Sequence, residues 1–112
     1  MQVKNVSRSI TLVKDLKLAT SFFTRLRGLL GRREFLLGEG LLIEPCNWVH
    51  TLGMRFPIDV LFLDKEHLVV AIERLKPNQF GTPQRCHCVL ELPWGTIGAS
   101  GTEIGDRLKL DF

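Results

Sequence analysis

The stretch IDVLFLDKEHLVVAIERL, residues 58–75, decides the fold of this chain. Residues 58–63 are apolar on both faces of an extended chain except at Asp59, which is typical of a strand in the middle of a sheet. Residues 64–67 are polar and predict a tight turn, after which residues 68–75 return as a second strand. The stretch therefore predicts a hairpin whose first strand, residues 58–63, lies inside a β-sheet.

Short strands separated by Gly and Pro turns are predicted on both sides of this hairpin, at residues 3–6, 10–13, 16–19, 41–44, 86–92 and 107–110. Apolar residues recur at helical spacing only in residues 21–30, which Gly31 would end, so we expect one short α-helix there. The glycine-rich residues 95–106 predict turns. The expected fold is mainly β, a compact sandwich or partly open barrel of short strands with one short α-helix at about residues 21–30.

Length and charge narrow the classes of function. A chain of 112 residues is expected to form a single domain, residues 1–112. Its net charge of +3 is small, and the arginines of residues 25–33 lie among phenylalanines that fit a core pattern, so nucleic acid is an unlikely partner. Residues 1–8 have no apolar signal core and no stretch is long enough to span a membrane, so we expect a soluble cytoplasmic protein.

The cysteines raise two hypotheses that strand geometry weakens. Cys86, His87 and Cys88 could form a zinc site together with Cys46 and His50. On a strand, however, Cys86 and Cys88 would share one face with Leu90 and Leu92 while His87 pointed away. A Cys46 nucleophile activated by His50 would have to span on the order of 13 Å of extended chain. We therefore expect three free cysteines, no metal, no cofactor and no catalytic cysteine.

Trp48 and His50 are the strongest candidates for ligand contact. They are two residues apart, so on an extended chain they share one face and form an aromatic surface beside an imidazole. Such a surface suits a sugar, a planar small molecule or a peptide. The alternative is structural: Trp48 would cap the core and His50 would bond a backbone carbonyl. Asp59 needs a cationic partner near the core, and Arg25 or Arg27 of the predicted helix could dock on it.

Several ordered blocks of the chain resemble one family. The blocks are RLRGLLGR at residues 25–32, HTLGMRFPIDVLFLD at residues 50–64, VLEL at residues 89–92, and Gly105-Asp106. Together they resemble domain of unknown function 192. The resemblance implies a compact, mainly β domain with one helix and names no reaction; some members accompany secretion or pilus systems. A shared site would draw on the matching residues His50, Met54, Arg55, Asp59 and Glu91.

These observations favour a small binding or accessory module whose ligand is unknown. The predicted ligand-binding residues are Trp48, His50, Arg55 and Asp59, with Arg27 and Glu91 as supporting charges. A second hypothesis is a hydrolase or transferase that uses His50 as a general base oriented by Asp59. A third is a purely structural interaction protein. The sequence predicts no catalytic residue set, and the oligomeric state stays open.

Overall fold

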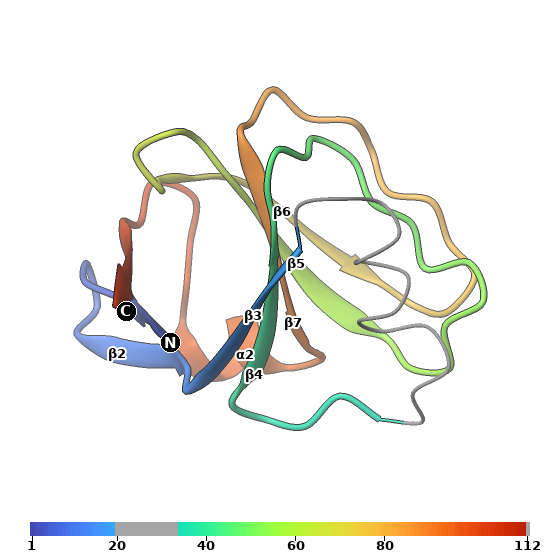
Figure 1. The fold of residues 1–112 in the computed structure, drawn as a ribbon, viewed down its shortest axis with the longest axis horizontal. Coiled ribbons are helices and arrows are strands. Elements are labelled where there is room, and N and C mark those ends of the chain that lie inside the picture. The colour runs from blue at the N-terminus through green and yellow to red at the C-terminus, as the bar shows by residue number, and fades with distance from the viewer. Residues whose placement is uncertain (20–33, 112) are drawn as a thin grey trace.

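The structure is a computed structural model that describes residues 1–19 and 34–111. In these two ranges the chain forms eight strands and one helix, which are shown in Figure 1. The strands are β1 (Gln2–Asn5), β2 (Ile10–Val13), β3 (Asp15–Ala19), β4 (Glu39–Ile43), β5 (Ile58–Leu63), β6 (Val69–Leu75), β7 (Cys88–Pro93) and β8 (Leu108–Asp111), and the helix is α2 (Thr96–Ser100).

The strands form two separate sheets. The smaller sheet has the order β2-β1-β8, and the larger has the order β3-β4-β7-β5-β6. Strands β3 and β4 are parallel, and the other described pairs are antiparallel. Over the described ranges the two sheets do not close into a barrel. The predicted fold class, a compact and mainly β fold of short strands, is confirmed.

The hairpin predicted at residues 58–75 is present, with β5 inside the larger sheet, as expected, and β6 at its edge. All six residues of β5 are buried, and this strand pairs with β6 on one side and β7 on the other. The turn between β5 and β6 is closed by Asp64, whose Oδ1 accepts the N–H groups of Glu66 and Leu68, both at 2.9 Å. His67 in this turn has a φ of 63°, a left-handed conformation that histidine adopts more readily than bulkier residues.

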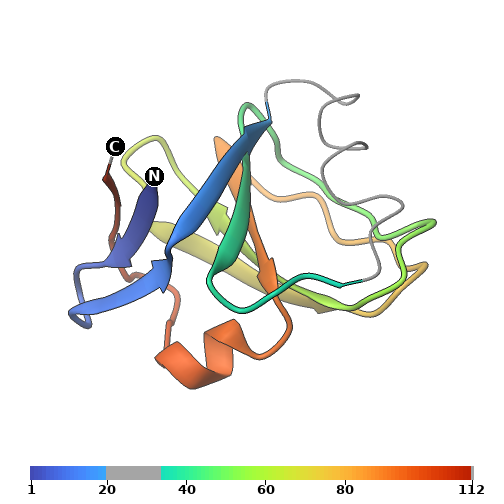
Figure 2. The ribbon, with the colours of Figure 1, turned by 60° about the horizontal axis from the view of Figure 1, so that its bottom comes forward.

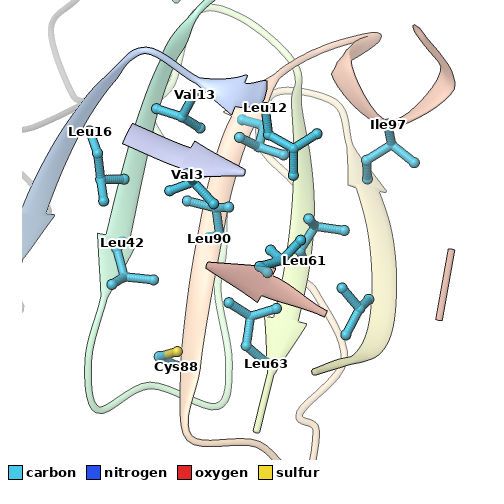
Figure 3. Packing of buried hydrophobic residues seen from close by; sticks show 13 residues of the cluster. Val3, Leu12, Val13, Leu16, Leu42, Leu61, Leu63, Cys88, Leu90 and Ile97 are labelled. Carbon is cyan, nitrogen blue, oxygen red and sulfur yellow. The ribbon is translucent and has the colours of Figure 1, made fainter. Parts of the chain in front are cut away.

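Two apolar clusters cover the two faces of the larger sheet. The inter-sheet core fills the space between the sheets and is drawn in Figure 3; its buried members are Val3, Leu12, Val13, Leu16, Leu42, Leu61, Leu63, Val69, Cys88, Leu90, Leu92, Ile97 and Leu108. The outer core lies on the opposite face; its buried members are Ala19, Leu41, Ile43, Val49, Met54, Phe56, Ile58, Val60, Phe62, Leu75 and Val89. Strand β5 contributes alternate residues to each, which explains its apolar sequence on both faces.

The helix expected at residues 21–30 lies outside the described residues. A short helix that the sequence did not predict, α2, replaces the turns expected after Gly95 and lies against β2 (Figure 2). Gly95 and Gly101 flank it with φ values of 95° and 69°, a backbone region that glycine adopts without steric cost. Among the described residues, no helix has both the length and the apolar character needed to cross a membrane.

Candidate functional site

Two loops run side by side over the outer core, residues 46–54 and residues 76–87, which we call the paired loops (Figure 1, green and yellow to orange). Backbone hydrogen bonds join them along their length: Thr51 N to Gln79 O at 2.8 Å, Gly81 N to Val49 O at 2.9 Å and Gln84 N to Asn47 O at 2.9 Å. Both loops are thereby held in a defined register. Side chains on one loop therefore have fixed neighbours on the other.

Thr51 links the paired loops through the hydrogen bonds of its buried side chain. Its side chain is fully buried, and its Oγ1 donates to the carbonyl of Lys76 and accepts the N–H of Gln79 at 2.9 Å. A buried hydroxyl that satisfies two backbone groups contributes more than an exposed one, because its loss leaves those groups unpaired.

We expect Thr51→Val to lower the free energy of unfolding by about 1–2 kcal/mol. Valine keeps the shape of the side chain but leaves the Gln79 N–H without this acceptor. Urea denaturation of the full chain measures the change. Thr82→Val, at an exposed threonine of the same loop, is the matched control and should change stability by less than about 0.5 kcal/mol. Equal effects of the two substitutions would contradict a special role for Thr51.

Three rings meet on the exposed side of the paired loops, and we call them the aromatic surface: Trp48, His50 and Phe80. The ring centroids of Trp48 and Phe80 are 5.9 Å apart with planes at 14°, and those of Trp48 and His50 are 5.6 Å apart. Trp48 Nε1 donates to the carbonyl of Gly81 at 2.8 Å, which fixes the indole. Trp48 and Phe80 remain 37% and 63% exposed. As predicted, Trp48 and His50 lie on one side of their segment.

The His50 imidazole is oriented by its own loop. Its Nδ1 accepts the N–H of Leu52 at 3.2 Å, and the backbone of His50 pairs with that of Phe80 as an isolated antiparallel bridge. Because Nδ1 is the acceptor, the neutral ring carries its proton on Nε2.

Asp59 lies away from the aromatic surface, on the other face of the larger sheet. Its Oδ2 accepts two backbone N–H groups at the start of α2, from Gly95 at 3.1 Å and Ile97 at 2.8 Å. Ile97 belongs to the inter-sheet core, whereas Val49, next to His50, belongs to the outer core. The structure therefore does not bring Asp59 to His50, and the hydrogen bonds described for Asp59 give no support to the general-base hypothesis.

The charged neighbour of Asp59 in the described residues is Arg74. The two residues are paired across β5 and β6, and Arg74 Nε lies 3.9 Å from Asp59 Oδ1. Burial raises the pKa of the Asp59 carboxyl, while the N–H of Ile97, the charge of Arg74 and the N–H of Gly95 act in the opposite direction. The partners predicted from the sequence, Arg25 and Arg27, lie outside the described residues.

Of the remaining predicted site residues, Arg55 is exposed on the segment that follows the first paired loop. Glu91 is fully buried in β7, opposite Leu41 of β4 and Val60 of β5. Those two neighbours belong to the outer core, so the carboxyl of Glu91 lies on the face that the paired loops cover. Arg27, its predicted companion, lies outside the described residues.

The cysteines are divided between the two faces of the sheet. Cys88 begins β7 in the inter-sheet core together with Leu90 and Leu92, whereas Cys86 packs against the outer core. The expectation that Cys86 and Cys88 share a face was wrong, because the strand starts only at Cys88. Burial raises the pKa of Cys88 to about 12 and also raises that of Cys86. Both are therefore thiols near neutral pH and poor nucleophiles.

Phe80 is the member of the aromatic surface that the sequence did not indicate. It lies in an irregular stretch rich in Gly and Pro, 30 residues beyond His50, and no periodic pattern links the two positions. The one available signal is a large apolar residue in a loop without apolar neighbours, a feature that often marks a contact surface.

Known proteins resemble this chain over nearly its whole length. The family model DUF192, described as "Uncharacterized ACR", matches residues 3–110. UPF0127 protein PF1050 of Pyrococcus furiosus is 35% identical over 94% of this chain and 94% of its own length, and UPF0127 protein PH1112 of Pyrococcus horikoshii is 29% identical over 96% of each.

Two crystal structures have the same fold. A protein from Sinorhizobium meliloti, provisionally named a transcription regulator, superposes with a TM-score of 0.81 and 26% identity, covering 96% of this chain and 89% of that one. A protein of unknown function from Novosphingobium aromaticivorans superposes with a TM-score of 0.81 and 22% identity, covering 97% and 82%. The family match and the sequence relatives agree over the same residues, and this chain belongs to the uncharacterised DUF192 (UPF0127) family.

Proposed function

We propose that this chain is a small binding module that holds a sugar, a planar small molecule or a short peptide against the aromatic surface. The observation that carries the proposal is the exposed pairing of Trp48 with Phe80, beside His50, on loops locked together by backbone hydrogen bonds. Rings with exposed area offer apolar stacking to a flat ligand, and a fixed geometry lowers the entropy lost on binding.

The polar groups near this surface supply orientation in the proposal. The His50 ring centroid lies 5.6 Å from that of Trp48 and 6.4 Å from that of Phe80. The neutral ring carries its proton on Nε2, which can donate to a carbonyl or hydroxyl oxygen of the ligand. In the proposal Arg55 keeps its predicted role as a ligand-binding residue, and Arg27 and Glu91 keep theirs as supporting charges. Asp59 has a structural role instead, because its carboxylate is committed to the backbone of α2.

Nucleic acid is not the ligand we propose, although the relative from Sinorhizobium meliloti is provisionally named a transcription regulator. The net charge is only +3, and the helix in the described residues has five residues, too short to fill a major groove. Binding to duplex DNA that weakens steeply with salt would favour a role as a transcription regulator instead.

A cytoplasmic location and a link to secretion or pilus systems remain predictions. Cell fractionation would test the first, and co-purification with components of such systems would test the second.

The second tryptophan makes a direct test possible. The chain has two tryptophans, so Trp94→Phe leaves Trp48 as the sole fluorophore on the aromatic surface. We expect titration of this variant with maltotriose, chitotriose or a proline-rich hexapeptide to give a saturable change in emission with at least one probe. Adding Phe80→Ala should weaken that binding by about 10-fold, the value of one ring contact.

A matched control is Ile104→Ala in the same Trp94→Phe background, because Ile104 is 64% exposed and lies in the turn before β8. It should bind as the parent does. Binding that survives Phe80→Ala unchanged, or no response to any of the three probes, would contradict the proposal.

A further inference from the structure

A cluster of metal-binding side chains lies at one end of the inter-sheet core. Glu44, His67 and Cys88 each offer one ligand atom, and these three atoms lie within 4.8 Å of one another. Glu44 follows β4, His67 lies in the turn between β5 and β6, and Cys88 begins β7. The three residues are therefore far apart in sequence and are brought together only by the strand order.

The register of the larger sheet explains the convergence. Strand β7 lies between β4 and β5, pairing Val89 with Ile43 and Cys88 with Leu63, so that one more step places Glu44 beside Cys88. Figure 3 shows the Cys88 sulfur at the end of the cluster, in a row with Leu42 and Leu63. His67 approaches from the turn that follows Leu63, and its carbonyl accepts the N–H of Leu108 in the smaller sheet.

The carboxylate of this cluster is already oriented. His87 Nε2 lies 2.7 Å from Glu44 Oε1, an arrangement in which the imidazole holds one carboxylate oxygen. By contrast, no described residue forms a hydrogen bond with the Cys88 thiol or the His67 imidazole. A carboxylate held by a neighbouring side chain, with a thiol and an imidazole within 4.8 Å of it, is the pattern of metal ligands with outer partners.

We propose that Glu44, His67 and Cys88 bind a zinc ion, with His87 positioning Glu44. One sulfur, one nitrogen and one oxygen donor form a set that Zn²⁺ accepts in a tetrahedral site with water as the fourth ligand. At ordinary zinc bond lengths, neighbouring donor atoms are about 3.5 Å apart, so the ligand atoms, which lie within 4.8 Å of one another, need to approach by at most about 1.3 Å. On binding, the Cys88 S–H bond breaks, a Zn–S bond forms and the proton passes to solvent.

The ion would link the ends of β4 and β7 to the turn that contains His67. Because this turn is hydrogen-bonded to β8, the ion would stabilise the contact between the two sheets. Cys88 is fully buried, whereas Glu44 and His67 are half-buried, so the ion would enter from the side of the carboxylate and imidazole. Of the five residues that the sequence suggested for zinc, only Cys88 is a ligand in this proposal. His87 contacts the Glu44 carboxylate and is not itself a ligand. Cys46, His50 and Cys86 lie on the other face of the larger sheet.

Cobalt titration of the metal-free full chain tests the site, because Co²⁺ in a tetrahedral thiolate site gives a thiolate-to-metal charge-transfer band and intense visible bands. We expect one equivalent of Co²⁺ to produce these bands and one equivalent of Zn²⁺ to remove them. Cys88→Ser should abolish the charge-transfer band. His67→Asn should weaken binding by at least about 100-fold, and asparagine tolerates the positive φ of this turn.

Cys86→Ser is the matched control, since Cys86 is a neighbouring, partly buried thiol on the other face of the sheet. It should keep the bands and the cobalt affinity of the wild type. Should Cys88→Ser fail to fold, as judged by circular dichroism, the affinity of His67→Asn decides. The proposal is overturned by the absence of the bands in the wild type, by their loss in Cys86→Ser, or by unchanged affinity in His67→Asn.

Discussion

Asp59→Ala is expected to lower the free energy of unfolding by about 3 kcal/mol, the largest loss we predict for a single polar side chain. Asp59 is fully buried, and its Oδ2 accepts the N–H groups of Gly95 and Ile97. Alanine would leave both groups without this acceptor at the start of α2. Urea denaturation measures the loss.

Asp59→Asn separates the hydrogen bonds from the charge. The asparagine Oδ1 can accept the same two N–H groups, so this variant should lie within about 1 kcal/mol of the wild type. If asparagine is as destabilising as alanine, the carboxylate charge beside Arg74 matters more than the backbone contacts.

The pH dependence of stability distinguishes the two variants further. Burial raises the folded-state pKa of Asp59 above its ordinary value of 3.8, so the folded chain holds this proton more tightly than the unfolded chain does. The contribution of the Asp59 carboxyl to the free energy of unfolding is therefore fully present below pH 3.8 and is lost as the pH rises through the raised pKa. We expect the stability of the wild type relative to Asp59→Asn to fall over that interval. If the stability of the wild type relative to Asp59→Asn rises with pH, the raised pKa of Asp59 is contradicted.

Asp106→Ala is expected to cost about 2–3 kcal/mol, because it breaks the polar link between the start of the chain and the turn before β8. Asp106 Oδ2 accepts from Asn5 Nδ2 at 2.9 Å, from Arg8 Nε at 2.6 Å and from the N–H of Glu103 at 3.0 Å. Asn5 is fully buried, so losing this acceptor leaves part of its amide dependent on Thr102 alone. Urea denaturation again measures the loss.

Glu103→Gln is the control for that substitution. Glu103 also pairs with Arg8, at 3.0 Å, but its side chain is 75% exposed, so its removal should change stability by less than about 0.5 kcal/mol. Comparable losses for both variants would show that Arg8, rather than the buried amide, accounts for the effect.

Asp106 should show the opposite pH dependence to Asp59. Burial alone would raise its pKa, but the hydrogen bonds from Arg8, Asn5 and the Glu103 backbone outweigh burial and lower it below 3.8. The stabilisation is therefore present above pH 3.8 and is lost as the pH falls through the lowered pKa. As the pH falls, the stability of the wild type should decrease relative to Asp106→Asn and increase relative to Asp59→Asn.

The strands could be predicted because their signal is local. Period-two alternation marks which residues share a face, and a run such as residues 58–63, apolar on both faces, can be accommodated only inside a sheet. The turn at residues 64–67 was predictable for the same reason, since Asp64 closes it through its own neighbours. Helix α2 escaped prediction because it has only five residues and its stabilising acceptor, Asp59, is distant in sequence.

The candidate sites depended on contacts that no local pattern encodes. The sequence placed Trp48 and His50 on one side of their segment, but Phe80 joins them only because the paired loops are held in register. The same limitation applied to Asp59: the sequence required a partner for a buried carboxylate and could not show that this partner is the backbone of α2.

By itself, the sequence determined the class of fold, the central strand and the family, because an apolar pattern on both faces of a strand and the order of the sequence blocks are properties of the chain. Only the tertiary structure decided which distant residues meet. Placing β7 between β4 and β5 brings Glu44, His67 and Cys88 to one end of the inter-sheet core. The physical reason is that strand order, unlike alternation along a strand, is set by how the whole chain buries its apolar surface.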